Sequence, residues 1–380
     1  MYYSAGNYEA FAHPKKVEGA EHKKAYIVGS GLAGLTTAFY LVRDAGVPGE
    51  NVFIFDRDPV SGGACDGAHD PKYGYYMRGG REMDNHFEVM WDVYRDVPSK
   101  GNPNVSVLDE YYWLNKEDPN YSLCRATDQC GHKLPTGHDF TLDKEAQTQL
   151  LKLFLTPEKE LEYKKISDCF DEHFWRSNFW LYWQTMFAFQ EWSSALEMKR
   201  YLQRYVHHID GLPDFTALRF TRYNQYESMI LPLLHYLEKR GVSFIPHSEV
   251  TNVIVKECPN GKKRAQSIEV VISGEKKTID LGTDDYVFVT NGSCVDSSCY
   301  GSQNKAPDLS LLQSGRGDSF DLWKAMARQV KDHSFGHPEA FCSNIEETNW
   351  MSATIDVDET LIPYITKITQ RDPRTGKVCT

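Results

Sequence analysis

One short segment constrains the fold of this chain more than any other: residues 25–34, AYIVGSGLAG. Four apolar residues run directly into the pattern Gly29-x-Gly31-x-x-Gly34, and LTTAFYLVRDAG then continues with apolar residues at helical spacing. A second apolar run, NVFIFD, follows and ends at Asp56. A strand, a glycine turn, a helix and a second strand that ends in an acid predict a βαβ unit of the kind that binds dinucleotides.

Each residue type in this pattern has a physical role. Gly29 makes the tight turn, Gly31 lets backbone N–H groups approach a pyrophosphate, and Gly34 lets the helix pack close to the strand. The carboxylate of Asp56 can accept hydrogen bonds from the hydroxyls of an adenosine ribose. The pattern alone fits both NAD and FAD.

Three later segments favour FAD. PVSGGACDG (59–67) places the pair Gly62-Gly63 just after Asp56, a placement common in flavoproteins that bind FAD in an extended form. By analogy with those proteins, Val250 in HSEVTNVIVKE offers backbone to the adenine, and DDYVFVTNGS (284–293) returns the chain to the pyrophosphate. The alternative for the last two segments is ordinary sheet structure.

The middle of the chain is predicted to be helical. Thr141 and Asp143 are candidate caps of a helix that ends near residue 155, and the aromatic stretch 174–209 lacks Gly and Pro, with a break near Glu191. The predicted fold class is therefore α/β, a Rossmann-like FAD-binding domain with an inserted, largely helical substrate domain. The expected parts are 20–135 (FAD-binding domain, first part), 136–225 (helical substrate or lid insertion), 226–300 (FAD-binding domain, return segment) and 301–380 (start of a truncated substrate domain).

Composition excludes several function classes. The net charge of −11 without a long basic block argues against nucleic acid as a partner. Nine cysteines without a CxxC pair predict reduced thiols in a cytoplasmic protein and no metal site. No run of 18 apolar residues predicts a membrane span. His207 and His208 have no acidic or cysteine partner at motif spacing, so we expect structural roles for them.

A second unusual pattern is RGGREM (78–83), in which Gly79 and Gly80 separate two arginines and Glu82 follows. By itself, Glu82 could be an ion-paired carboxylate between Arg78 and Arg81. This loop, together with MYYSAGNYEAF, VLDEYYWLNKEDPNYS, NFWLYWQTMFAF and VHHIDGL, resembles the FAD-dependent oleate hydratases, formerly called myosin-cross-reactive antigens. The resemblance covers essentially all 380 residues.

The resemblance implies a fold similar to the amine-oxidase-like flavoproteins. It implies an activity that adds water across the cis-9 double bond of oleic acid to give 10-hydroxystearic acid, without net redox change. Glu82 would then be the general base that activates water, and Tyr201 the acid that protonates the alkene, with Tyr205 as its rival one helical turn away. The implied substrate is an unsaturated fatty acid, oleate or linoleate. A homodimer and a peripheral membrane contact in the full-length family are also implied.

The residues expected to bind the cofactor FAD, from pattern and resemblance together, are Gly29, Gly31, Ala33, Gly34, Asp56, Arg57, Gly63, Ala64, Arg78, Gly79, Gly80, Arg81, Glu82, Met83, Val250, Asn291 and Ser293.

Two other readings stay open. The family has a further C-terminal stretch that holds the fatty-acid carboxylate, and we expect this chain to lack it. The chain could then be an inactive, truncated flavin-binding protein. It could also be a lipid-directed flavin oxidoreductase or double-bond isomerase.

Overall fold

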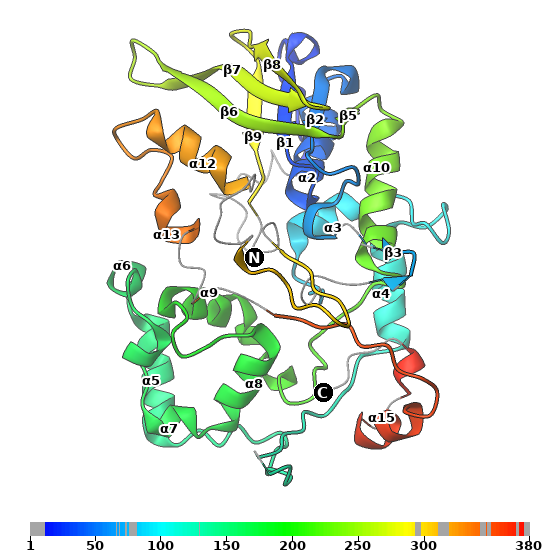
Figure 1. The fold of residues 1–380 in the computed structure, drawn as a ribbon, viewed down its shortest axis with the longest axis vertical. Coiled ribbons are helices and arrows are strands. Elements are labelled where there is room, and N and C mark those ends of the chain that lie inside the picture. Colours follow the sequence, from blue (N-terminus) through cyan, green and yellow to red (C-terminus); the bar gives the residue numbers. More distant parts are fainter. Residues whose placement is uncertain are drawn as a thin grey trace. The chain divides into compact units, whose positions relative to one another are not determined.

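The structure is a computed structural model that describes residues 12–65, 67, 69–72, 74–75, 82–128, 130–292, 298–310, 319–342, 347, 351–369 and 372–375 (Figure 1). The chain divides into two compact units. The first unit comprises Met1–Arg81, Phe87–Tyr111 and Thr221–Ile345, and the second comprises Glu82–His86, Tyr112–Phe220 and Glu346–Thr380.

A parallel sheet forms the centre of the first unit. Its strands are ordered β5-β2-β1-β9, and every neighbouring pair is parallel. The strands are β1 (Ala25–Val28), β2 (Val52–Phe55), β5 (Ser243–Ile245) and β9 (Tyr286–Val289). All four residues of β1 are buried, as expected of an apolar strand with neighbours on both sides.

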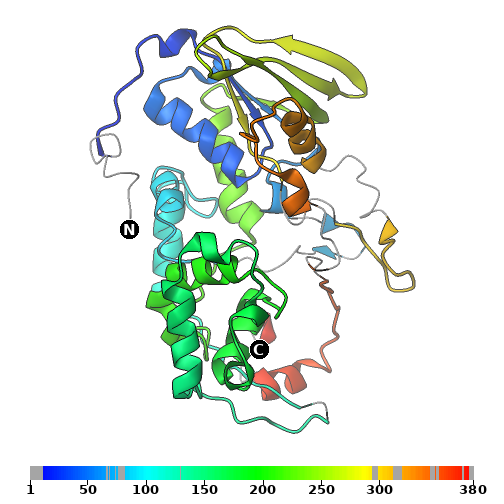
Figure 2. The ribbon, with the colours of Figure 1, turned by 90° about the vertical axis from the view of Figure 1, so that its left-hand side faces the viewer.

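Two helices lie together beside this sheet. Helix α2 (Leu32–Tyr40) follows β1, and α10 (Leu231–Glu238) precedes β5 (Figure 1; Figure 2). The rings of Phe39 and Tyr236 join them, with centroids 5.0 Å apart.

An antiparallel sheet of three strands, β6-β7-β8, adds a second layer to the first unit. The strands are β6 (Ser248–Glu257), β7 (Lys263–Ile272) and β8 (Glu275–Asp280), and α12 (Ser319–Arg328) lies beside β6. Leu322 and Met326 of α12 belong to the same buried cluster as Val253 of β6 and Val28 of β1. This cluster therefore joins the two sheets and α12 into one core.

The remaining elements are short, except for α4 (Val107–Glu117), which has 11 residues and crosses the division between the units at Tyr111. The short ones are η2 (Ala20–His22), η3 (Leu41–Ala45), η4 (Gly49–Asn51), η5 (Gly63–Cys65), β3 (His69–Asp70), β4 (Gly74–Tyr75), α3 (Glu88–Tyr94), η8 (Tyr226–Ile230) and α13 (Pro338–Cys342). In the second unit they are α6 (Glu158–Leu161), η6 (Ile166–Asp168), η7 (Val206–Gly211), α15 (Ile362–Thr369) and η9 (Pro373–Thr375).

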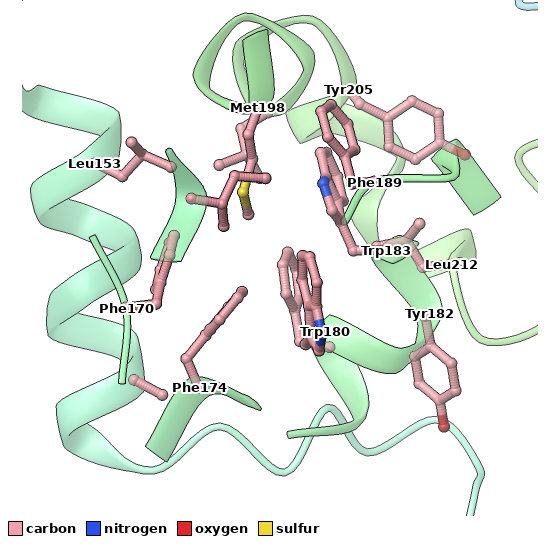
Figure 3. Packing of buried hydrophobic residues seen from close by; sticks show 14 of the residues in the cluster. Leu153, Phe170, Phe174, Trp180, Tyr182, Trp183, Phe189, Met198, Tyr205 and Leu212 are labelled. Atoms are coloured by element: carbon pink, nitrogen blue, oxygen red, sulfur yellow. The ribbon is translucent and has the colours of Figure 1, made fainter. Parts of the chain in front are cut away.

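The second unit is helical and has an aromatic core. Its main helices are α5 (Lys144–Leu155), α7 (Glu172–Trp175), α8 (Asn178–Phe187) and α9 (Ala195–Tyr205). In Figure 3 the rings of Phe174, Trp180 and Trp183 lie within the cluster, while the Tyr182 hydroxyl points away from it. That hydroxyl donates a 2.7 Å hydrogen bond to the carbonyl of Gly137. Apolar and aromatic burial therefore dominates the stability of this unit.

Serine and aspartate caps set where these helices begin. Asp143 accepts from the backbone N–H of Ala146 at the start of α5, Ser177 caps α8 and Ser194 caps α9. Each cap satisfies one N–H group that the first helical turn leaves unpaired. Asp143 is the expected cap, whereas Thr141 is not one: its backbone is left-handed (φ 48°), and its hydroxyl accepts from Asn178.

The structure confirms the coarse fold prediction, a mixed α/β chain with a parallel sheet. The strands expected at 25–28 and 51–56 are β1 and β2, and the aromatic stretch breaks between α8 and α9, around the expected Glu191. The two units divide at Tyr111 and Phe220, and Glu82–His86 groups with the helical unit. Among the described residues, no helix has the length and apolar character needed to cross a bilayer.

The aromatic core generates a stability prediction. Phe174 is fully buried and stacks on Phe170 with ring centroids 3.9 Å apart. We expect Phe174→Ala to lower the free energy of unfolding of the helical unit by about 3–5 kcal/mol, because it leaves a cavity. Urea titration followed by tryptophan fluorescence measures the loss. Tyr163→Ala is the matched control, since Tyr163 is 91% exposed and its loss should change little. Equal effects of the two variants would contradict this account of the core.

Candidate functional site

The turn after β1 depends on two glycines that approach each other. The N–H of Gly29 donates to the carbonyl of Phe55 at 2.8 Å, and Gly29 adopts φ 97°, a conformation that side chains disfavour. A Cβ atom on Gly34 would lie 2.0 Å from the carbonyl oxygen of Gly29. Only glycine at position 34 allows α2 to pack this close to the strand end.

A second glycine pair lines the start of α2. Gly31 is the N-cap of α2 and makes no side-chain capping bond. The neighbouring N–H of Gly62 donates to the carbonyl of Ser30 at 3.0 Å, and a Cβ on Gly63 would meet the Cα of Gly31 at 3.1 Å. Two stretches of bare backbone therefore meet at the helix N-terminus, where the helix dipole favours an anion.

Asp56 lies at the end of β2, beside this turn. Its Oδ2 accepts the backbone N–H of Ser30 at 2.7 Å and also the Ser30 hydroxyl. Its Oδ1 accepts the N–H of Asp58 at 2.9 Å. A carboxylate offers about four acceptor positions, so Asp56 is fixed in orientation and keeps capacity for one further donor.

The chain returns to the same place after β9. The N–H of Thr290 donates to the carbonyl of Val28 at 3.0 Å, and Trp323 Nε1 donates to the carbonyl of Asn291 at 2.9 Å. The backbone N of Asn291 lies 3.4 Å from where a Gly29 Cβ would stand. The structure thus brings together, at the carboxyl end of β1, the predicted residues Gly29, Gly31, Gly34, Asp56, Gly63 and Asn291.

The other predicted cofactor residues are placed as follows. Ala33 is exposed on the first turn of α2, Ala64 lies in η5, and Arg57 is exposed with its Nε 3.6 Å from Asp58 Oδ1. The Val250 side chain is buried in the core, so any role in binding falls to its backbone. Arg78, Gly79, Gly80, Arg81 and Ser293 lie outside the described residues.

Glu82 begins a short segment that is held at both ends within the helical unit. Glu82 is exposed, and the next residue, Met83, is buried. Met83 pairs with Arg219: the Met83 N–H donates to the Arg219 carbonyl at 2.8 Å, and the Arg219 N–H donates back at 3.1 Å. The guanidinium of Arg204 donates to the carbonyl of His86. Residues 82–86 are therefore fixed against α9 and the segment around residue 219.

The two candidate tyrosines on α9 have different surroundings. Tyr201 is 41% exposed, and its ring meets those of Phe187 and Phe189 edge-on at 5.4 and 5.1 Å. Tyr205 is 8% exposed. Burial, and then the nearby Asp84 and Glu82 carboxylates, raise the pKa of Tyr205, while Arg219 opposes this shift. The phenol of Tyr205 therefore stays protonated at neutral pH.

Three histidines gather beside this segment. The ring of His207 lies 4.3 Å from that of His86 and 4.2 Å from that of His208, between centroids. His208 Nε2 lies 3.1 Å from Asp84 Oδ1. Partial burial and the neighbouring imidazoles lower the pKa of His207. The acidic partner that the sequence did not indicate for His208 is thus Asp84.

Sequence reasoning missed several of these residues. Ser30 and Trp323 hold Asp56 and Asn291, and Arg219 and Arg204 hold the segment 82–86. Asp84 and His86 stand directly after RGGREM, which was a usable signal. Arg219 carries no motif, so only the fold identifies it.

The fold and this site define an α/β protein with a glycine-lined turn at the end of a central parallel strand and a helical unit that carries ionisable residues. A family model described as "MCRA family" matches residues 22–380, and the chain belongs to this family.

Two characterised relatives are similar over most of the chain. An "Oleate hydratase" of Streptococcus pyogenes serotype M49 (strain NZ131) is 47% identical over 382 aligned residues, which cover 100% of this chain and 64% of that protein. A "Linoleate hydratase" of Lactiplantibacillus plantarum is 29% identical and covers 92% of this chain and 64% of that protein. The chain thus spans 64% of the length of each of these two relatives, slightly less than two thirds.

Solved structures match at low similarity. An oxidoreductase from Methanosarcina mazei is 14% identical with a TM-score of 0.42, covering 72% of this chain and 60% of that one. A CLA-producing fatty acid isomerase from P. acnes is 14% identical with a TM-score of 0.40, covering 71% and 59%.

The close approach of α2 to the turn generates a second prediction. We expect Gly34→Ala to destabilise the first unit by at least about 1–3 kcal/mol, because the new methyl group overlaps the Gly29 carbonyl. Gly31→Ala is the matched control. Gly31 has φ −69°, and its added Cβ would meet nothing closer than the Gly63 Cα at 3.8 Å. The control should cost no more than about 1 kcal/mol, the usual cost of alanine at an N-cap. Thermal unfolding of both variants measures the difference, and similar melting temperatures would refute the steric argument.

Proposed function

We propose that this chain is a FAD-dependent fatty acid hydratase that adds water across the cis-9 double bond of oleic acid, giving 10-hydroxystearic acid without net redox change. The observation that carries the proposal is that one unit holds the Glu82 carboxylate and the phenols of α9 together: the charge of Glu82 contributes to the raised pKa of Tyr205. The 47% identical oleate hydratase supports the substrate class.

Hydration of an alkene needs a base and an acid at once. In the proposed reaction the water oxygen forms a bond to one alkene carbon and releases a proton to the carboxylate of Glu82. The π electron pair takes the phenolic proton of Tyr201 at the other carbon. The tyrosinate then regains a proton and Glu82 loses one, so that atoms and charge balance over the cycle. The Glu82 carboxylate is exposed, so that a water molecule can reach it.

Exposure favours Tyr201 over Tyr205 as the acid. The acid must recover its proton in every cycle, and Tyr201, 41% exposed, can exchange protons with solvent. Tyr205 is buried, and its hydroxyl has no hydrogen-bond partner among the described residues. We assign Tyr205 to holding the shape and polarity of the site next to Glu82 and Asp84.

The residues at the end of β1 fit the dinucleotide part of FAD. Positions 29, 31, 34 and 63 form a cradle that side chains would fill, and α2 begins there without a side-chain cap. Gly31, Gly63 and the N-terminus of α2 would hold the pyrophosphate, and Asp56 would accept from the ribose. A bound flavin would supply electrostatic stabilisation and no hydride transfer, because hydration changes no oxidation state.

Several expectations stay predictions. They are the cytoplasmic location, the homodimer, the peripheral membrane contact, and binding of the flavin ring by the RGGREM loop. The same holds for activity on linoleate, which the printed name of the second relative suggests.

The proposed reaction generates a third prediction. Incubation of the purified chain with FAD, a reductant and oleate in ¹⁸O-labelled water should give labelled hydroxystearate, measured by mass spectrometry. Glu82→Gln and Tyr201→Phe should each lower the rate by about 10²–10⁴-fold, because each removes one partner of general acid–base catalysis. Tyr205→Phe is the matched control one helical turn away and should lower the rate far less.

Other products would decide between the alternatives. A shifted double bond without label would indicate an isomerase, and consumption of an electron acceptor would indicate an oxidoreductase. If a folded, flavin-bound chain gives no product, the proposed activity is refuted. A larger loss in Tyr205→Phe than in Tyr201→Phe would move the role of acid to Tyr205.

A fourth prediction tests the cofactor site separately from turnover. Gly31→Ala should leave the fold intact but weaken FAD binding roughly tenfold or more, about 1.4 kcal/mol, because a methyl group would enter the cradle. Flavin fluorescence quenching during titration of the apoprotein measures the affinity. Gly282→Ala is the control, since Gly282 is exposed and a Cβ there would meet nothing closer than the Asp285 carboxylate at 3.4 Å. Unchanged affinity in Gly31→Ala would contradict the placement of FAD at this turn.

A further inference from the structure

We propose that His86, His207 and His208 form a binding site for one divalent transition-metal ion of the zinc class. One ligand atom from each histidine lies within 4.8 Å of the other two. The ring centroids are 4.3 Å apart for His86 and His207, 4.2 Å for His207 and His208, and 5.6 Å for His86 and His208. All three residues belong to the helical unit. The proposal does not depend on the hydratase activity.

The ligand nitrogens of the three rings lie near one another. Histidine nitrogens bind zinc at 2.0–2.1 Å, so that two of them in a tetrahedral site are about 3.3 Å apart. The observed upper limit of 4.8 Å exceeds this value, so the side chains have to rotate when metal binds. His86 and His207 are exposed, so that water has access to the remaining coordination positions.

Asp84 supplies the second feature of a histidine metal site. Its Oδ1 accepts from His208 Nε2 at 3.1 Å and from the backbone N–H of His86 at 2.8 Å. Because a carboxylate only accepts, Nε2 of His208 carries the proton and Nδ1 is left as the basic nitrogen. A carboxylate on the far nitrogen of a histidine ligand is the usual arrangement in metal sites, where it fixes the ring and raises its basicity.

The rest of the fold holds the three ligands in place. His207 and His208 lie in η7, directly after α9, and His86 ends the segment that the Met83–Arg219 pair fixes. Arg204 donates to the His86 carbonyl and places a positive charge near the three histidines. The negative charge of Asp84 opposes the repulsion between this charge and a metal cation.

The donor set determines the class of metal. Three imidazoles suit Zn²⁺, Cu²⁺ and Ni²⁺, whereas Mg²⁺ and Ca²⁺ prefer oxygen. A second group of potential ligands, Asp128, Cys130 and His132, is fully exposed within one loop. There Asp128 already accepts the His132 ring and the N–H of Cys130. The Asp128 oxygens are thus already hydrogen-bonded within the loop, so the histidine group is the stronger candidate.

The test is metal binding by the flavin-containing protein after chelator treatment. Titration with Zn²⁺ against a chromophoric chelator should show one site with a submicromolar dissociation constant. Co²⁺ in place of Zn²⁺ should give the visible absorption of a low-coordinate site with imidazole ligands. His207→Ala and His86→Ala both change exposed side chains and should fold normally. Each should weaken binding by more than the roughly 10–100-fold that loss of a supporting carboxylate causes.

Three further variants make the test specific. His173→Ala removes an exposed histidine that bonds Asp143 elsewhere in the unit, and it should bind metal like the parent. Cys130→Ser should also bind normally, because the loop group is not the site. Asp84→Asn should weaken binding about 10–100-fold and change the Co²⁺ spectrum, a readout that a merely structural role would not move. Binding that survives His207→Ala, or that is lost in Cys130→Ser, would overturn the proposal, as would the absence of a submicromolar site.

Discussion

The contact between Gly34 and the Gly29 carbonyl determines the architecture of the first unit. With no side chain at position 34, α2 begins against the carboxyl end of β1. Because β1 has β2 on one side and β9 on the other, both Asp56 and Asn291 arrive at that same end. The meeting of these backbone segments therefore follows from strand order and one close approach.

The helical unit obtains its chemistry in another way. Its core is a cluster of apolar and aromatic side chains, and the carboxylates of Glu82 and Asp84 come from the short segment Glu82–His86. The reciprocal bonds between Met83 and Arg219 fix the register of that segment. One carboxylate, Asp84, then ties it to His208.

The sequence predicts a structural feature when the interacting residues are close together in the chain, and it fails when they are far apart in the chain. The glycine turn, β1, β2 and the Asp143 cap are each determined by residues that are close together in the sequence. The sequence therefore predicts each of them. Thr141 fits the same local pattern but turned out to accept a bond from Asn178. Asp84 and His208 are 124 residues apart, and no periodicity links them. The sequence alone therefore predicts structural roles for His207 and His208, and it contains no signal for Arg219.

The two tyrosines of α9 are the same residue type but differ in burial, and their proposed roles follow from that difference. They are the same residue type one helical turn apart, yet Met198 and Leu202 on the buried face draw Tyr205 into the core and leave Tyr201 at its edge. Burial raises the pKa of Tyr205 and slows proton exchange, which suits a group that must stay neutral beside two carboxylates. A phenol that gives up its proton in each cycle needs the opposite environment. The amphipathic pattern of α9 thus gives Tyr201 and Tyr205 the different environments that the proposed reaction requires of them.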